Sequence, residues 1–95
     1  MFKEIEPQKV QEMQEEGAVN VVDIRDENSY SIGHIPNSVS LNDTNVKEYI
    51  ESTDKEKPLV VCCYHGNSSR GAAEYFSQQG FKEVYSMTGG FAAWP

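Results

Sequence analysis

One short stretch of this chain, residues 63–70, gathers the side chains best suited to chemistry: Cys-Tyr-His-Gly-Asn-Ser-Ser-Arg. Cys63 follows an apolar run, a loop with Gly66 and Asn67 comes next, and the serines after it can start a helix. Such a turn directs several backbone N–H groups at one point, where they hold an anion or stabilise a thiolate. A free cysteine has a pKa of about 8.5, and a pKa of about 6.5 would make Cys63 mostly thiolate at pH 7. The stretch predicts an activated nucleophile beside an anion site.

The distribution of charge limits the classes of ligand that the protein can bind. The 95 residues carry a net charge of −7, from 8 basic and 15 acidic side chains, so we expect no nucleic-acid partner and no membrane partner. Within residues 58–73, however, Arg70 is the one charged side chain. A small anionic ligand is therefore disfavoured over most of the surface but can approach this segment.

The reactive stretch needs a scaffold, and the remaining sequence predicts one. The expected strands cover residues 2–5, 19–23, 39–41, 59–62 and 84–87, and the expected helices cover 7–17, 26–33, 46–50, 68–80 and 89 onward. This alternation predicts an α/β fold with a mostly parallel central sheet of about five strands and helices on both faces. Ligands bind beyond the carboxyl ends of such strands, where Asp23, Arg25 and Cys63 would lie.

Length and cysteine content bound the class of protein. The chain is long enough for one small domain, residues 1–95, around one core. Cys62 and Cys63 have Cα atoms about 3.8 Å apart, closer than the roughly 4.4 Å that an unstrained disulfide needs, so we expect two thiols. If the strand persists, Cys62 points away from Cys63 into the core, and a resolving thiol is its alternative role.

The cellular compartment follows from the same features. No charged-then-apolar signal segment opens the sequence, and no apolar run approaches the length of a membrane span. Two unpaired thiols suit a reducing environment. We therefore expect a cytoplasmic protein.

Three ordered motifs give the chain a resemblance to the rhodanese family from end to end. Residues 23–25 (Asp-Ile-Arg) followed by residues 33–36 (Gly-His-Ile-Pro) look like the family's first signature, and residues 89–94 (Gly-Gly-Phe-Ala-Ala-Trp) look like its second. The loop of residues 63–68 is similar to that of bacterial GlpE-type single-domain thiosulfate sulfurtransferases. The resemblance implies a rhodanese-like α/β fold, and a last helix that continues beyond Pro95, where this sequence stops.

The resemblance also implies a mechanism. The Cys63 thiolate would attack the outer sulfur of thiosulfate, sulfite would leave, and the persulfide would pass its sulfur to cyanide in assays or to a reduced thiol protein in the cell. No metal and no organic cofactor is implied. The substrate-binding set is then the rest of the loop, through its backbone and its lining side chains: Tyr64, His65, Gly66, Asn67, Ser68, Ser69 and Arg70.

Several of these residues have alternative roles. His65 is expected to line the loop and attract anions rather than to act as a base, because sulfur transfer between thiophiles needs little proton chemistry. Arg70 either adds positive potential over the site or is a solvated helix residue. The residues expected to be structural are the pair Asp23 and Arg25, the hydrogen-bonding His34, and the core anchors Phe91 and Trp94.

Three other functions compete with a thiosulfate enzyme. A cysteine-dependent phosphatase can share the fold, but it needs an arginine at the position of Ser69 to grip phosphate, and Arg70 lies about 100° further round a helix. The loop also has no Asp to protonate a leaving alcohol. A non-enzymatic interaction module would have no need of Cys63. A persulfide relay carrier would use the same cysteine, so this alternative stays open.

Overall fold

The computed structural model describes residues 1–95. Its elements are, in chain order, β1 (Lys3–Ile5), α1 (Pro7–Glu15), β2 (Asn20–Asp23), α2 (Glu27–Ile32), β3 (Val39–Ser40), α3 (Val46–Ser52), β4 (Leu59–Cys62), α4 (Ser68–Gln78), β5 (Val84–Met87) and η1 (Phe91–Ala93). Every predicted strand and helix is present except the last helix. In its place η1 is a short 3₁₀ turn, in which Ala93 N donates to Gly90 O and Trp94 N donates to Phe91 O, both at 3.0 Å.

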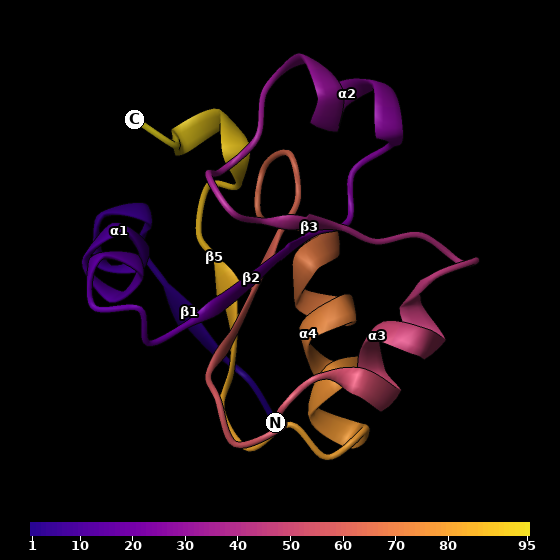
Figure 1. Cartoon of the computed structure of the whole chain (residues 1–95). Coiled ribbons are helices and arrows are strands. Elements are labelled where there is room, and N and C mark those ends of the chain that lie inside the picture. The colour runs from indigo at the N-terminus through magenta and orange to yellow at the C-terminus, as the bar shows by residue number, and fades with distance from the viewer.

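The strands form one sheet in the order β1-β5-β4-β2-β3, and every neighbouring pair runs parallel (Figure 1). β4 lies in the middle, between β2 and β5, and all of its residues are buried. A strand with neighbours on both edges and helices on both faces must be apolar throughout. The predicted α/β fold with a parallel five-stranded sheet is therefore confirmed.

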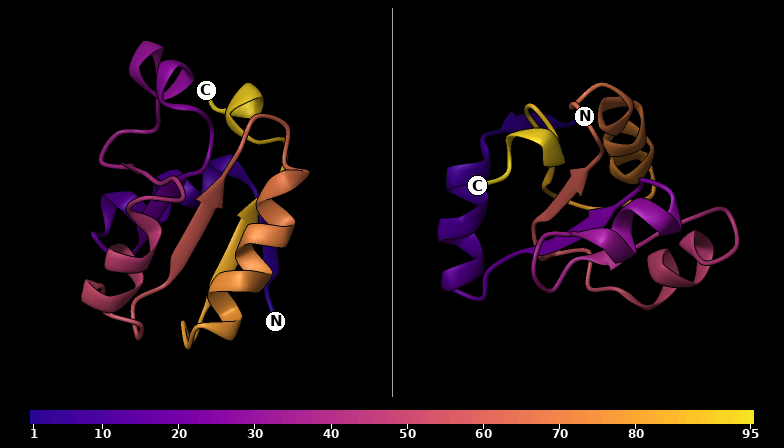
Figure 2. Two further views of the ribbon diagram at one scale, coloured as in Figure 1. Left: turned by 90° about the vertical axis from the view of Figure 1, so that its right-hand side faces the viewer. Right: turned by 90° about the horizontal axis from the view of Figure 1, so that it is seen from above.

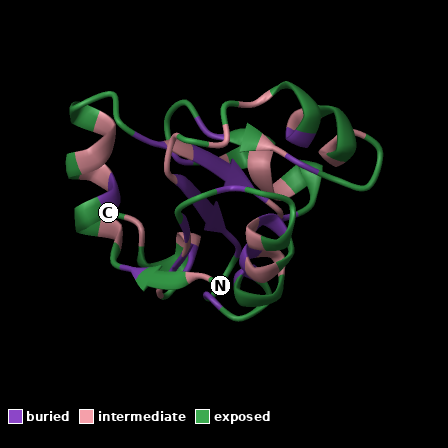
Figure 3. Ribbon diagram, turned by 90° about the horizontal axis from the view of Figure 1, so that it is seen from below, coloured by how far each residue is buried: buried purple, intermediate pink, exposed green.

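Helices cover both faces of this sheet. α1 lies on one face, and α3 and α4 lie on the other (Figures 1 and 2). The core is divided in the same way, because Leu59 and Val61 belong to the apolar cluster under α3 and α4, whereas Val60 and Cys62 belong to the cluster under α1. The buried positions run along the strands between these layers (Figure 3). Alternate residues of β4 thus anchor opposite layers, and each fully buried Val or Leu contributes about 1.5–3 kcal/mol.

Local signals set the helix boundaries. α1 begins at Pro7, which has no N–H to leave unpaired in the first turn. α2 begins after Asp26, whose carboxylate accepts a hydrogen bond from the Ser29 N–H at 3.0 Å. This bond, together with one from the Ser29 hydroxyl, holds the pKa of Asp26 below its ordinary value. None of the helices combines the length and the apolar character needed to cross a membrane.

Gly71 offers a test of how well α4 is formed. It lies inside α4 without a positive φ, and no atom lies within 4 Å of the Cβ that an alanine would add. Gly71→Ala should raise the free energy of unfolding by about 0.5–1 kcal/mol, because alanine loses less backbone entropy than glycine in a helix. Urea denaturation measures the change. A decrease in stability would mean that this turn of α4 is not helical in solution.

Candidate active site

Cys63 is the first residue after β4, which places its thiol at the carboxyl edge of the sheet. Its Sγ accepts a hydrogen bond from the N–H of Gly66 at 3.2 Å and another from the N–H of Ser69 at 3.3 Å. Ser69 lies in the first turn of α4, where amides are free of intrahelical partners and the helix dipole favours negative charge. The predicted convergence of loop amides on the sulfur is present.

Two opposing influences act on the pKa of Cys63. Burial raises the pKa, because the residue is only 3% exposed. Hydrogen bonds from the hydroxyls of Ser69 and Ser68 and from the amides of Ser69 and Gly66 lower it. These bonds outweigh burial, so the pKa of Cys63 lies below its ordinary value. The site favours the reactive thiolate.

Cys62 has the opposite surroundings, although it is the next residue. Its side chain is fully buried in the apolar cluster under α1, together with Val60 and Met87. Burial raises the pKa of Cys62 to about 12. Both cysteines are free thiols, and the two neighbours differ because the pKa of Cys62 is raised and the pKa of Cys63 is lowered.

The remaining loop residues divide into buried and exposed groups. Gly66 and Ser69 are buried beside the sulfur, and the exposed side chains are those of Tyr64, His65, Asn67 and Ser68. Arg70 is exposed and pairs with Glu4 of β1 at 3.9 Å. This pairing favours the interpretation of Arg70 as a solvated helix residue rather than as a source of positive potential over Cys63.

The C-terminal turn holds the loop from outside. Phe91 N donates to Cys63 O at 2.7 Å and Ala92 N donates to Tyr64 O at 3.0 Å. Gly90 makes this approach possible, since a Cβ there would lie 2.4 Å from the Tyr64 carbonyl and its φ of 61° is in the left-handed region. The first loop carbonyls are therefore directed at η1, while later loop amides are directed at the sulfur.

A buried ion pair braces the same region from β2. Arg25 Nε lies 3.1 and 3.0 Å from the Asp23 carboxylate oxygens, and Arg25 Nη2 donates to Asp23 Oδ2 and to Gly33 O, both at 2.7 Å. The guanidinium carbon lies 4.2 Å from the Phe91 ring centroid and 5.4 Å from that of Tyr64. The expected structural pair is confirmed, and it connects β2, the end of α2, the loop and η1.

The other residues expected to be structural also have clear partners. His34 Nδ1 lies 2.8 Å from the Tyr30 carbonyl oxygen, and its ring stacks on that of Tyr30 with centroids 3.9 Å apart. Phe91 and Trp94 pack against the cluster under α1. These residues shape the surroundings of the loop.

Two features of the site were not predicted from the sequence. The adjacent glycines 89 and 90 were expected to open the last helix, whereas Gly90 forms a close contact with the loop. Ser69 Oγ also lies 2.7 Å from the buried Ser86 Oγ of β5. The available signal for this pair was a serine inside an otherwise apolar strand pattern, which marks a polar group that needs a partner.

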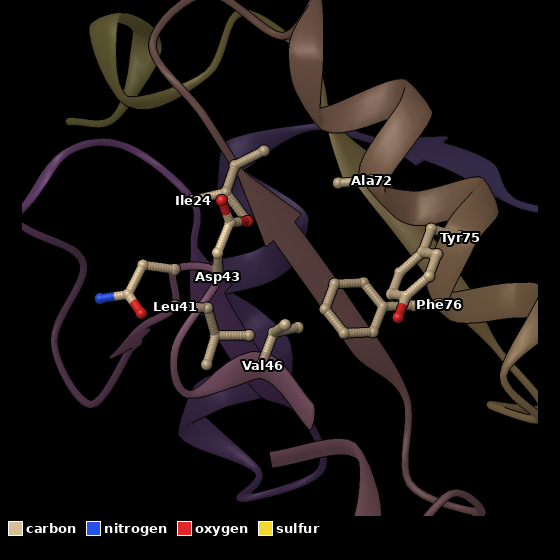
Figure 4. A pocket seen from close by; sticks show the side chains of 8 residues that line it. Ile24, Leu41, Asp43, Val46, Ala72, Tyr75 and Phe76 are labelled. Carbon is tan, nitrogen blue, oxygen red and sulfur yellow. The ribbon is translucent and has the colours of Figure 1, made fainter. Parts of the chain in front are cut away.

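An open pocket of about 320 Å³ lies on the same face of the sheet as α4 (Figure 4). The residues that line it are Ile24, Leu41, Asn42, Asp43, Val46, Ala72, Tyr75 and Phe76. It has no cysteine and no basic side chain, and the carboxylate of Asp43 repels an anion. This pocket is therefore poorly suited to an anion, whereas the loop after Cys63 directs two N–H groups at one point.

Gly90→Ala should separate the loop from η1. The added Cβ would collide with the Tyr64 carbonyl, so we expect a loss of at least about 2 kcal/mol of stability and slower alkylation of Cys63 by iodoacetamide. Gly17→Ala is the matched control, because Gly17 also has a positive φ but has no atom within 4 Å of the added Cβ. Equal losses in the two variants would show that the contact with the loop is unimportant.

The two thiols should differ in alkylation. At pH 7 the folded protein should take up one iodoacetamide adduct, on Cys63, because a thiol with a lowered pKa remains thiolate at lower pH. In urea both cysteines should react. Peptide mapping by mass spectrometry identifies the modified residue, and modification of Cys62 in the folded protein would contradict the assignment.

Comparison with known proteins agrees with this geometry. The protein-family model of the Rhodanese-like domain matches residues 6–95 of the sequence. The thiosulfate sulfurtransferase GlpE of Ectopseudomonas mendocina is 52% identical and that of Pseudomonas aeruginosa 50% identical, each over 93 residues that cover 98% of this chain and 84% of the relative. The crystal structure of a rhodanese-related protein from Thermoplasma volcanium superposes with a TM-score of 0.82 at 29% identity, over 98% of this chain and 90% of that one. The chain belongs to the rhodanese-like domain family.

Proposed function

We propose that this protein is a thiosulfate sulfurtransferase that carries sulfane sulfur on Cys63. The observation that carries the proposal is the Cys63 sulfur itself, which accepts hydrogen bonds from Gly66 N and Ser69 N and has a lowered pKa. The relatives named thiosulfate sulfurtransferase, which match nearly the whole chain, supply the donor. An activated thiolate inside an anion-binding loop suits a donor that is a small dianion with an electrophilic sulfur.

The first half of the reaction loads the enzyme. The Cys63 thiolate attacks the outer sulfur of thiosulfate, a new S–S bond forms, and the S–S bond of the donor breaks as sulfite leaves with the electron pair. The product is a Cys63 persulfide whose outer sulfur carries the negative charge. The same loop amides that hold the thiolate can hold this anion, and no step needs a proton.

The second half returns the free thiolate. A thiophilic acceptor attacks the outer sulfur of the persulfide, and Cys63 leaves as thiolate. Cyanide would give thiocyanate, and a reduced thiol protein would become a persulfide itself; the latter is the acceptor that we propose for the cell. The residues that would line the entrance are the exposed Tyr64, His65, Asn67 and Ser68. Two free thiols and a persulfide intermediate suit the reducing cytoplasm.

The position of Ser69 argues against a phosphatase. Ser69 is fully buried, and its hydroxyl pairs with Ser86, whereas a phosphatase would place a guanidinium there to grip phosphate oxygens. The neighbouring Arg70 pairs with Glu4 at the surface. A small loop that offers N–H groups and hydroxyls is better suited to stabilise a persulfide than to grip a phosphate ester.

The proposed function predicts a covalent intermediate on one cysteine. After incubation with thiosulfate, the intact mass should increase by one sulfur atom, and the peptide map should place that atom on Cys63. Cys63→Ser should lose both the adduct and the transfer of sulfur to cyanide, because a hydroxyl cannot form a persulfide. Initial rates should show ping-pong kinetics, since the loaded enzyme is a free intermediate between donor and acceptor.

Cys62→Ser is the matched control for this experiment. It should keep the adduct and most of the rate, with a stability loss of about 1 kcal/mol from burying a hydroxyl in place of a thiol. Sulfur on Cys62, or an active Cys63→Ser variant, would show that the nucleophile is assigned wrongly. A protein that accepts no sulfur from thiosulfate, but takes it from a protein persulfide at Cys63, would be a relay carrier instead.

A further inference from the structure

Ser86 is a polar residue in an apolar layer. It lies on β5, is 1% exposed, and pairs in register with Val61 of β4. Val84, two residues earlier on the same side of the strand, belongs to the apolar cluster under α3 and α4. The hydrogen-bond partner of the Ser86 hydroxyl is Ser69 Oγ, at 2.7 Å. A buried hydroxyl with a single partner contributes little to stability by itself, so the role of Ser86 must depend on what its partner, Ser69, does.

The partner touches the reactive sulfur. Ser69 donates its backbone N–H to Cys63 Sγ at 3.3 Å, and its hydroxyl also lowers the pKa of Cys63. The Ser69 hydroxyl bonds to Ser86, and the Ser69 N–H is the group that contacts Cys63 Sγ. A thiolate can only accept hydrogen bonds, so the orientation of Ser69 decides how well this N–H stabilises the thiolate.

We propose that Ser86 is a positioning residue for the sulfur chemistry, which holds the Ser69 side chain so that the Ser69 N–H stays directed at the anionic sulfur of Cys63. The bond between Ser86 and Ser69 is buried, so water does not compete with it. The same orientation suits any anionic state of the sulfur. The proposal rests on Cys63 as the nucleophile of the proposed function.

Charged groups around this chain of hydrogen bonds are mostly paired with one another. The titratable and charged residues on the surrounding elements are Lys3 and Glu4 on β1, Asp23 and Arg25 at the end of β2, Cys62 on β4, Tyr64 and His65 in the loop, Arg70, Glu74 and Tyr75 on α4, and Tyr85 on β5. Glu4, which is in register with Ser86, pairs with Arg70 at 3.9 Å, and Asp23 pairs with Arg25 at 2.7 Å. Variants at Ser86 leave all of these groups in place.

The test compares two substitutions of the same shape. Ser86→Thr keeps the hydroxyl and Ser86→Val replaces it with a methyl group, and both β-branched residues suit a strand. The measurement is the rate of Cys63 alkylation by iodoacetamide against pH, which needs no sulfurtransferase activity. Ser86→Val should move the profile to higher pH and slow alkylation about three- to tenfold on its acid side, as expected when the charge-assisted hydrogen bond from the Ser69 N–H to the sulfur is weakened. Ser86→Thr should keep the wild-type profile.

Ser38→Ala is the control for a purely structural effect. Ser38 is also buried, and its hydroxyl donates to Ile35 O at 2.7 Å, away from the loop. It should lower stability without moving the alkylation profile. Coincident profiles for Ser86→Thr and Ser86→Val, or a shift in Ser38→Ala as large as that in Ser86→Val, would overturn the proposal. Since alkylation is independent of thiosulfate, failure of the proposed function would be seen separately, as the absence of a persulfide.

Discussion

The reactive loop depends on the backbone contact between residues 63–64 and the C-terminal turn. Phe91 N donates a hydrogen bond to the Cys63 carbonyl oxygen at 2.7 Å, and Ala92 N donates one to the Tyr64 carbonyl oxygen at 3.0 Å. A peptide plane whose oxygen is fixed on one side directs its N–H to the other, so these bonds restrain the loop as it turns back toward the sulfur. The contact works only because Gly90 has no side chain between the two segments. The C-terminal turn η1, although distant in sequence, thus helps to hold the loop in the conformation in which Gly66 N and Ser69 N stabilise the thiolate.

The Asp23–Arg25 pair completes this arrangement from the opposite direction. Buried ion pairs add little net stability, because desolvation offsets the attraction, but losing one partner leaves a costly unpaired charge. The pair therefore acts mainly as a geometric constraint. Its guanidinium faces both Phe91 and Tyr64 and binds the Gly33 carbonyl. The site is consequently assembled at a junction of β2, β4, α2 and η1, rather than within one segment.

Local patterns in the sequence were sufficient to predict the scaffold and to propose Cys63 as the nucleophile. The continuous apolar run of Leu59–Cys62 predicted the central strand, and the alternation of side chains in any strand predicted that Cys62 points into the core, where it lies. Contacts between distant segments could not be predicted from such local patterns. The close approach of Gly90 to the loop, the pairing of Arg70 with Glu4 and the contact of Ser69 with Ser86 all join segments that are distant in sequence. Periodicity and spacing carry no information about these pairs.

The net charge of −7 repels a dianionic donor over most of the protein surface, so the active-site loop must attract the donor locally. The loop can do so without a guanidinium or an ammonium group directed at the sulfur, since the donors on Cys63 are amides and hydroxyls. Fixed dipoles lose little reorganisation energy as charge arrives, and they hold an anion without the strong attraction of a full positive charge. That balance suits a cycle in which a dianion enters, sulfite must leave, and a persulfide anion must remain accessible. An arginine at position 69 would favour retention of the oxyanion product, whereas the serine at that position donates its N–H to the sulfur and leaves sulfite free to depart.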